Sequence, residues 1–410
     1  MRNLSPWPML AMLLLGILFL REPRFQRGEE VFLRWLLENS QTRGATVPLT
    51  VIEIGSNPLE QKPAGEKEST EAFLHTGGST ISPLEYALFL QSVLEFQPTV
   101  VAFENILKWR VRDKDQEQVF LDQAMRVPKL LLGAELTDTP DPDAPVVELT
   151  TFKQVSGRRG ELLEFSGIGK QPTEDMRLIS TLGFMNLLED ANTFHVPLLF
   201  QYRGDVIPSF TLQALMLWLR VTPAEVKVEL GSQIVLPQGR KIPIRADGTV
   251  LVDPKAARKA RRMNLNELLL AAQTREKNGM TTAHLENIHD QIVLARTPAN
   301  PFSPPDVFAA TIATIQSNHY VRRVSWIFDC TVILLVTALA GILHRVTKDI
   351  LILGATALTA GYCLVALAII SQWGIWIPGY LPLGAVWLIV LLNLFSRRKR
   401  LSSGVPSPIV

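Results

Sequence analysis

The sequence contains little that would support covalent cross-linking or a cysteine metal site. Its 410 residues include only two cysteines, Cys330 and Cys363, and both lie inside apolar runs. This excludes a disulfide framework and a cysteine zinc site. The formal net charge is only +2, so no global field attracts nucleic acid or an acidic substrate.

Motifs for phosphate and metal binding are also missing. The stretch GIGKQPT around Gly169 contains a glycine and a lysine, but Gln171 follows the lysine and no glycine stands five residues before Gly169. This spacing does not match a phosphate-binding loop. His284 and His289 are five residues apart, which places them on different faces of a helix. We therefore expect neither a cofactor nor a metal site.

The residue types of a catalytic triad occur in the sequence, but without the motif that would surround its nucleophile. Ser209, His195 and Asp190 are the required residue types, but no strained elbow sequence surrounds the serine. Pro208 and Ser209 are better explained as the start of a helix. We expect that the protein is not an enzyme.

Long apolar runs lie at both ends of the sequence. Three of them, residues 326–344, 350–371 and 375–395, approach the roughly 20 residues that a helix needs to cross a bilayer. The N-terminal apolar run, residues 7–20 of a predicted anchor at 7–25, is shorter and could instead be the apolar part of a signal peptide. Because Leu20-Arg21-Glu22-Pro23 offers no small-residue cleavage site, we interpret it as an uncleaved anchor. The expectation is four transmembrane helices.

Basic residues in the short loops predict the orientation of these spans. Four of them, at 397–400, follow the last span, and Arg345 and Lys348 lie in the turn after 326–344. The stretch SQWGIWIPG, residues 371–379 between the last two spans, has none. Residues 396–410 and 1–6 are therefore expected in the cytoplasm and residues 26–325 outside. Arg21, Arg24 and Arg27 argue against this orientation at the first span.

Residues 26–325 have the alternating pattern of an α/β domain. The apolar stretches PLTVIEIG, TVVAF and KLLLGAEL are separated by amphipathic helical segments, which predicts a largely parallel or mixed sheet. Ser82, Pro83 and Glu85 are typical of a capped helix start. Farther along, QIVL and RKIPIRADGTVLVDP predict a hairpin with its tight turn at Asp247-Gly248.

The last segment before the apolar runs predicts a helix that relays a signal. Ser303 caps it, Phe308, Ile312 and Ile315 share one face, and the helix is expected to continue through NHYVRR to the membrane. We expect one buried stripe, with Gln316 outside it.

Two carboxylates are candidates for ligand binding. Glu53 and Glu104 come at the ends of the apolar strands VIEIG and VVAFEN, where α/β sheets often place binding groups. The alternative is that they cap helices or face water.

Taken in order, several stretches resemble the second class of CHASE domain, the extracellular sensing module associated with bacterial cyclases and histidine kinases. They are SPLEYALFLQSVLEFQPTVVAFENIL, GFMNLLEDANTFHVPLLFQYRGDVIPSFTLQALMLWLR, IPIRADGTVLVDP and PDVFAATIATIQSNHYVRR. One span before the domain and three after it are also the family's arrangement. Glu104 stands where the family usually has Asp. A long polar loop replaces the family's short Trp/Pro-rich link after the first strand.

The resemblance implies a sensory protein of the bacterial inner membrane. Family members generally carry an output domain after the last span, whereas only residues 396–410 follow it here. We therefore expect a membrane-anchored sensor or regulatory subunit that acts through a separate membrane or cytoplasmic output protein. Its other partner is the lipid bilayer, nucleic acid is not a partner, and homo-oligomer formation is left open. The alternative is a structural or assembly protein of the envelope, with the domain as a docking surface.

Overall fold

The computed structural model divides the chain into two compact units. It describes residues 23–40, 46–55, 81–109, 113–139, 149–188, 194–278, 288–297, 306–324, 326–343, 348–388 and 390–391. One unit runs from Gly44 to Tyr320, and the other combines Met1–Arg43 with Val321–Val410. We call them the α/β unit and the helical unit. The α/β unit is shorter at both ends than the predicted domain, residues 26–325.

The α/β unit is built on a six-stranded sheet in the order β16-β1-β17-β2-β3-β8. Every neighbouring pair in this sheet is parallel. The strands are β1 (Leu49–Glu53), β2 (Val100–Phe103), β3 (Leu130–Ala134), β8 (Thr181–Phe184), β16 (Arg261–Asn264) and β17 (Ile292–Arg296). The predicted α/β class with its parallel sheet is therefore confirmed.

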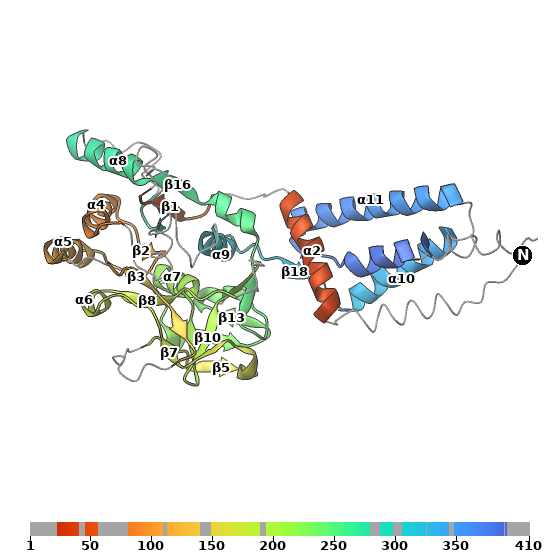
Figure 1. Ribbon diagram of the computed structural model, residues 1–410, viewed down its shortest axis with the longest axis horizontal. Coiled ribbons are helices and arrows are strands. Elements are labelled where there is room, and N and C mark those ends of the chain that lie inside the picture. Colours follow the sequence, from red (N-terminus) through yellow and green to blue (C-terminus); the bar gives the residue numbers. More distant parts are fainter. Residues whose placement is uncertain are drawn as a thin grey trace, which may run out of the picture. The chain divides into compact units, whose positions relative to one another are not determined.

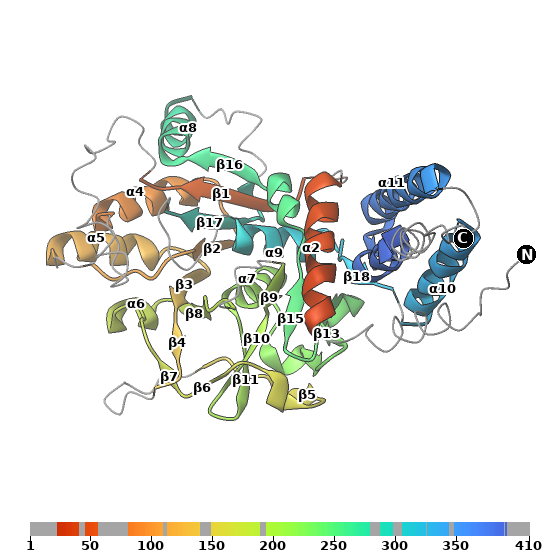
Figure 2. The same ribbon diagram turned by 45° about the vertical axis from the view of Figure 1, so that its right-hand side comes forward.

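Helices cover both faces of this sheet, as Figures 1 and 2 show. One face packs on α4 (Pro83–Leu94), α5 (Lys114–Ala124), α6 (Glu174–Leu178) and α8 (Leu265–Asn278). The other face packs on α7 (Phe210–Leu219) and α9 (Val307–Gln316). The result is a three-layer α/β/α arrangement with two buried cores, one on each side of the sheet.

Helix α4 forms as its sequence predicts. The side chain of Ser82 accepts a hydrogen bond from the backbone N of Glu85 at 3.3 Å, and Pro83 occupies the first turn. Tyr86 and Phe89 lie on the buried face. Both rings meet Phe103 of β2 edge to face, so one amphipathic helix closes this side of the sheet.

Smaller β-structures complete the α/β unit. They contain β4 (Leu136–Thr137), β5 (Gln154–Ser156), β6 (Glu164–Phe165), β7 (Gly167–Ile168), β9 (His195–Pro197), β10 (Leu199–Tyr202), β11 (Asp205–Pro208), β12 (Lys227–Glu229), β13 (Gln233–Val235), β14 (Lys241–Pro243) and β15 (Thr249–Leu251). Short 3-10 helices are η2 (Arg159–Glu161), η3 (Pro223–Glu225), η4 (Pro237–Gly239) and η5 (Pro254–Lys259).

The hairpin predicted around Asp247-Gly248 is partly wrong. The tight turn exists, because the backbone N of Gly248 donates to the carbonyl of Arg245 at 3.1 Å and Gly248 has φ +75°. However, β14 pairs with β13 and β15 pairs with β9. The turn therefore connects strands of two different sheets.

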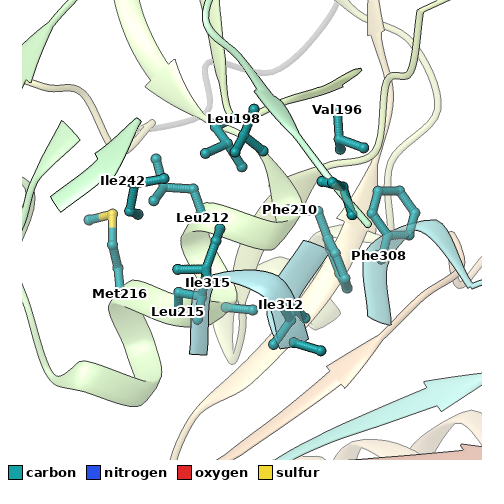
Figure 3. Close-up of a cluster of buried hydrophobic side chains, with 14 of the residues drawn as sticks. Val196, Leu198, Phe210, Leu212, Leu215, Met216, Ile242, Phe308, Ile312 and Ile315 are labelled. Atoms are coloured by element: carbon teal, nitrogen blue, oxygen red, sulfur yellow. The ribbon is translucent and has the colours of Figure 1, made fainter. Parts of the chain in front are cut away.

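The core on the α7/α9 side is a continuous apolar cluster (Figure 3). Its centre is the contact of Phe210 on α7 with Phe308 on α9, whose ring centroids are 5.3 Å apart. Ile312 and Ile315 extend the cluster along α9. Gly183 of β8 lies against α7, where an added Cβ would be 2.8 Å from the Phe210 ring. Helix α7 therefore packs very closely on the sheet.

The helical unit contains α2 (Pro23–Asn39), β18 (Arg322–Arg323), α10 (Trp326–Leu343), α11 (Lys348–Trp373) and β19 (Ile375–Trp376). Residues 380–388 and 390–391 are also helical, and we call this stretch the last helix. Leu351 and Ala355 of α11 share a small core with Val386 and Val390 of the last helix. The last helix thus begins five residues later than the predicted span at 375–395, because a strand comes first.

Among the described residues, one helix, Asp349–Trp373, is long and apolar enough to cross a membrane, with a mean hydropathy of 2.1. It covers the predicted span at 350–371. Helix α10 coincides with the predicted span at 326–344 except at its end, and most of the predicted anchor at 7–25 lies outside the described residues. The prediction of four transmembrane helices is therefore not confirmed; only the span at 350–371 has a matching candidate helix among the described residues.

Candidate functional site

Three charged residues lie at the carboxyl ends of three adjacent strands of the parallel sheet. Glu53 of β1 is in register with Arg296 of β17. Phe103 of β2 is in register with Ala295, and the backbone N of Glu104 donates to the carbonyl of Ala295 at 2.8 Å. The three charged residues therefore form a row across the carboxyl edge of the sheet, with Arg296 in the middle.

The row points to a single face of the sheet. Side chains alternate along a strand, and Val51, Leu294 and Ala102, each two positions before a member of the row, all belong to the core on the α7/α9 side. The two predicted ligand-binding residues thus lie on one face, about 9–10 Å apart, since two strand spacings separate them. Glu104 is fully buried and Glu53 is half-buried.

Asp306 and Arg262 extend this charged cluster. One carboxylate oxygen of Asp306 lies 2.6 Å from Nη1 of Arg296 and 2.7 Å from Nη2 of Arg262. Burial opposes ionisation of Asp306, but the two guanidinium groups outweigh it and hold its pKa below the ordinary value. Asp306 immediately precedes α9 and has φ +71°. The ion pairs therefore attach the start of α9 to β16 and to the end of β17.

The chain connections diverge at this edge. The chain leaves β1 and β2 for α4 and α5 on one face, but it leaves β17, which lies between them, for α9 on the other face. In open α/β sheets such a divergence beyond the carboxyl ends of strands is the usual place for ligands. Carboxylates and guanidinium groups together can bind a small polar molecule that carries charges of both signs.

Sequence reasoning found two members of this cluster and missed three. Arg296 ends the strand IVLAR, so a charged residue after an apolar run was a usable signal. Nothing in the sequence connects Asp306 with Arg262, because 44 residues separate them and only the fold brings them together.

Of the groups considered for catalysis, the structure describes Ser209 and His195. The hydroxyl of Ser209 caps α7 by accepting from the backbone N of Leu212, and it also contacts the hydroxyl of Thr211. Burial and the nearby Arg245 lower the pKa of His195 to about 4, so this imidazole is neutral at pH 7. Asp190 and His284 lie outside the described residues. Within the described ranges, no cluster of three or more His, Cys, Asp or Glu could hold a metal.

The predicted relay helix is more deeply buried and shorter than expected. All ten residues of α9 are buried, including Phe308, Ile312 and Ile315. The expectation of a single stripe is therefore wrong, as is the exposed position of Gln316, whose Nε2 donates to the carbonyl of Pro48 at 3.1 Å. The helix ends at Gln316 instead of continuing through NHYVRR, because Asn318 adopts φ +52°. Ser303 lies outside the described residues.

The segment that follows α9 enters the helical unit as a strand. Its strand β18 pairs in parallel with β19, the link between α11 and the last helix. The backbone N of Arg322 donates to the carbonyl of Gly374 at 2.8 Å, and that of Val324 donates to Trp376 at 3.3 Å. The guanidinium of Arg323 lies 5.0 Å from the centre of the Trp376 ring and 3.5 Å from the buried carboxylate of Asp329 on α10.

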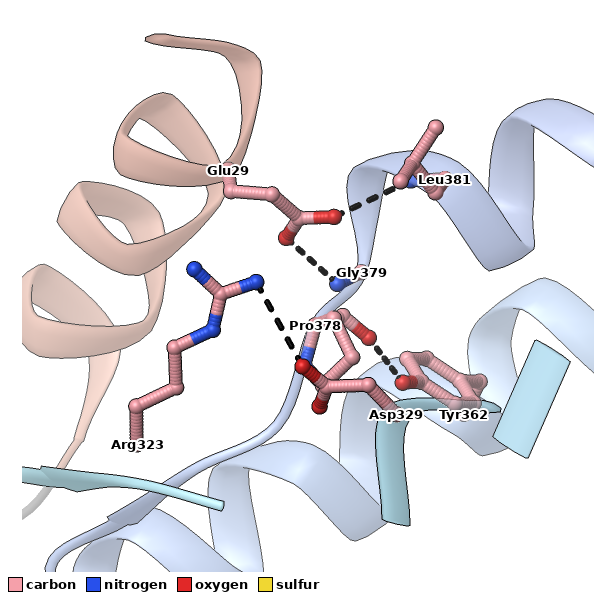
Figure 4. Close-up of polar contacts among 7 residues, drawn as sticks. All are labelled: Glu29, Arg323, Asp329, Tyr362, Pro378, Gly379 and Leu381. Carbon is pink, nitrogen blue, oxygen red and sulfur yellow. Dashed lines mark hydrogen bonds and ion pairs between the residues drawn. The ribbon is translucent and has the colours of Figure 1, made fainter. Parts of the chain in front are cut away.

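A carboxylate of α2 caps the last helix (Figure 4). The two oxygens of the buried Glu29 accept from the backbone N of Gly379 at 2.8 Å and of Leu381 at 3.1 Å. Gly379 has no side chain that could cap the helix. A Cβ added at this position would be 2.2 Å from the Phe32 ring, so α2 packs closely against it. The hydroxyl of Tyr362 on α11 donates to the carbonyl of Pro378. The link between α11 and the last helix is therefore held from α2, β18 and α11, and β18 is in turn paired with Asp329 of α10. We call these contacts the junction.

No family model, curated protein or solved structure matches this chain.

Proposed function

We propose that this chain is a membrane-anchored sensor or regulatory subunit of the bacterial inner membrane, with the α/β unit outside the cytoplasm. A ligand or an envelope protein binds the α/β unit, a CHASE-like sensory domain. A separate membrane or cytoplasmic protein produces the output.

The outward-facing apolar side chains of the helical unit support the membrane placement. On α11, Leu353 and Leu364 are among the most exposed large apolar residues of the described chain, and Leu334 and Leu335 of α10 are also exposed. In water this exposure would cost about 25 cal/mol for each Å² of apolar surface. Within hydrocarbon the same surface is solvated by lipid tails.

The observation that carries the sensor proposal is the pairing of β18 with β19 at the junction. The strand that follows α9 is hydrogen-bonded to the link between two helices of the bundle. A shift of this strand must therefore break or move the backbone bonds of Arg322 and Val324, as well as the ion pair from Arg323 to Asp329. The β18–β19 pairing can transmit a signal only if its structure differs between the ligand-free and the ligand-bound protein.

Binding at the charged cluster provides the input in this proposal. Arg296 contacts the carboxylate that precedes α9, so a ligand that competes for Arg296 releases the start of this helix. The same helix leads directly to β18. Input and output are thus joined by one short stretch of chain.

Transmission can be tested by perturbing the cluster and measuring the junction. Arg296→Gln removes the ion pair to Asp306, and the sensor proposal predicts faster amide hydrogen exchange at Arg322 and Val324 in the full chain in nanodiscs. Leu178→Gln, an exposed position on α6, is the control and should change nothing. Unaltered exchange at the junction in both variants would count against a relay.

Topology needs its own measurement. Alkaline phosphatase fused after residue 303 should be active, and a fusion after residue 400 should be inactive. The reverse pattern would place the α/β unit in the cytoplasm.

A docking function is the second candidate, and one surface favours it. Leu84 and Leu88 lie one turn apart on α4 and are both exposed, and Val119 on the neighbouring α5 is exposed too. Apolar residues gathered in this way are typical of protein contacts. If Leu84→Ser combined with Leu88→Ser abolishes function while Arg296→Gln leaves both junction and function intact, the scaffold proposal is the better one.

A further inference from the structure

Helix α2 lies crosswise to the bundle helices of its own unit. Figures 1 and 2 show its axis running across the ends of α10 and α11 instead of along them. A helix in this orientation cannot cross the bilayer together with α11. If α11 spans the membrane, α2 lies close to the membrane plane.

The contacts of α2 fix its level along the bundle. An added Cβ at Gly28 would be 2.8 Å from the ring of Tyr380, and Glu29 caps the last helix at Gly379. Both contacts are at the start of the last helix, six or seven residues after α11 ends at Trp373. Helix α2 therefore lies at the height where the two helices meet their connecting link.

Aromatic residues gather at this same height. Trp373 and Tyr380 are both more than half exposed, Trp35 of α2 is 39% exposed, and the Trp35 ring stacks on Phe32 at 5.9 Å. Trp and Tyr are enriched where membrane proteins meet the headgroup region. The aromatic residues thus mark one membrane interface.

One side of α2 also exposes apolar surface that its packing does not use. The buried residues Leu33, Leu36 and Leu37 occupy one side, whereas Val31 on the other is 69% exposed. Trp35, one turn after Val31, continues this edge, and the exposed Arg27, one turn before it, supplies a positive charge. Arg34 and Glu38 are exposed beside this edge as well, and a short apolar edge with tryptophan and basic residues next to it is found on helices that lie at a lipid surface.

We propose that α2 is an interfacial helix whose Val31–Trp35 edge enters the boundary between lipid headgroups and acyl chains. Its partner is the lipid surface on the outer side. This inference rests on the membrane placement proposed above and adds a second lipid contact outside the spans. Through Glu29, a change in the depth or tilt of α2 also acts on the cap of the last helix.

Nitroxide labels on the full chain can measure the depth of α2 in nanodiscs of phosphatidylethanolamine and phosphatidylglycerol. The labels are placed one at a time by Val31→Cys, Leu353→Cys and Leu178→Cys, in a background carrying Cys330→Ala and Cys363→Ala. All three positions are highly exposed, so labelling leaves the packing unchanged. Oxygen relaxes labels in lipid, whereas a water-soluble nickel chelate relaxes labels in water.

We expect the label at 353 in the acyl core, the label at 178 in water, and the label at 31 about 5–10 Å below the headgroups. A label at Arg27 should lie closer to water than the label at 31.

Comparing the three labels distinguishes a failure of the α2 proposal from a failure of the membrane placement. If 353 is deep but 31 is as open to the nickel chelate as 178, α2 is not interfacial and the membrane placement stands. If 31 is closed to both reagents, protein covers this edge and the lipid proposal is wrong. If 353 itself is open to the nickel chelate, the proposed membrane function fails.

Discussion

The ion pairs of Asp306 should contribute measurably to the stability of the α/β unit. Asp306→Asn removes the negative charge between Arg296 and Arg262 but keeps a side chain that tolerates φ +71°. The Arg296 side chain is only 11% exposed, so its bond belongs to the class of charged hydrogen bonds worth about 1.5–3 kcal/mol. Arg262 is 40% exposed, and such a pair contributes about 0–1 kcal/mol.

The amide of the variant retains one acceptor oxygen, so a hydrogen bond to the charged Arg296 can remain, but the attraction between opposite charges is lost. We therefore expect a loss of about 2 kcal/mol. For a unit of this size 1 kcal/mol corresponds to about 2–4 °C, which gives a fall in Tm of about 4–8 °C.

The matched control is Asp290→Asn. Asp290 also has positive φ, +61°, but its side chain is 70% exposed, and surface changes of this kind stay within about 0.5 kcal/mol. Thermal unfolding of the full chain in mild detergent, followed by near-ultraviolet circular dichroism, compares the two variants. Equal Tm values would refute the reasoning.

The same pair predicts a pH dependence of known sign. Because the folded-state pKa of Asp306 is lowered, its stabilisation is complete above the unfolded-state pKa of about 3.9 and disappears as the pH falls through the folded value. The Tm gap between the native chain and Asp306→Asn should therefore be constant near neutral pH and close only below about pH 4. A gap that already narrows between pH 7 and pH 5 would show that another group is responsible.

Two further predictions concern the junction and α9. Glu29→Gln should speed hydrogen exchange at Gly379 about tenfold or more, because a charged bond of about 1.5–3 kcal/mol is weakened. Glu30→Gln on the same helix should leave this exchange unchanged. Similar exchange in the two variants would show that Glu29 does not cap the last helix. Ile312→Ala should cost about 2–5 kcal/mol in thermal unfolding because the side chain is fully buried. Leu270→Ala, at an exposed position, should cost less than about 0.5 kcal/mol, and comparable losses would contradict the packing described for α9.

Local sequence determined much of the fold. The capped start of α4 follows from contacts within a few residues, and the alternation of apolar strands with helical segments predicts the parallel class of the sheet. The positions of Glu53 and Glu104 at strand ends were also predictable, because each follows an uninterrupted apolar run. These features need no knowledge of distant neighbours.

Only the tertiary structure decided which strands are neighbours. β17 lies between β1 and β2 in the sheet, although about 190 residues separate it from β2 in the sequence. β15 pairs with β9 and not with its expected hairpin partner. A strand carries the same alternation whichever partner it takes, so the choice depends on the total surface buried.

The contacts on which the proposed function rests are of the same long-range kind. Glu29 reaches Gly379 across 350 residues, and Arg262 meets Asp306 only because β16 and α9 converge at one edge of the sheet. A carboxylate in a sequence shows its charge but not the donor that it will face. Burial makes the contact of Glu29 specific, since a charge left alone in the interior costs several kcal/mol, and burial is decided by the fold.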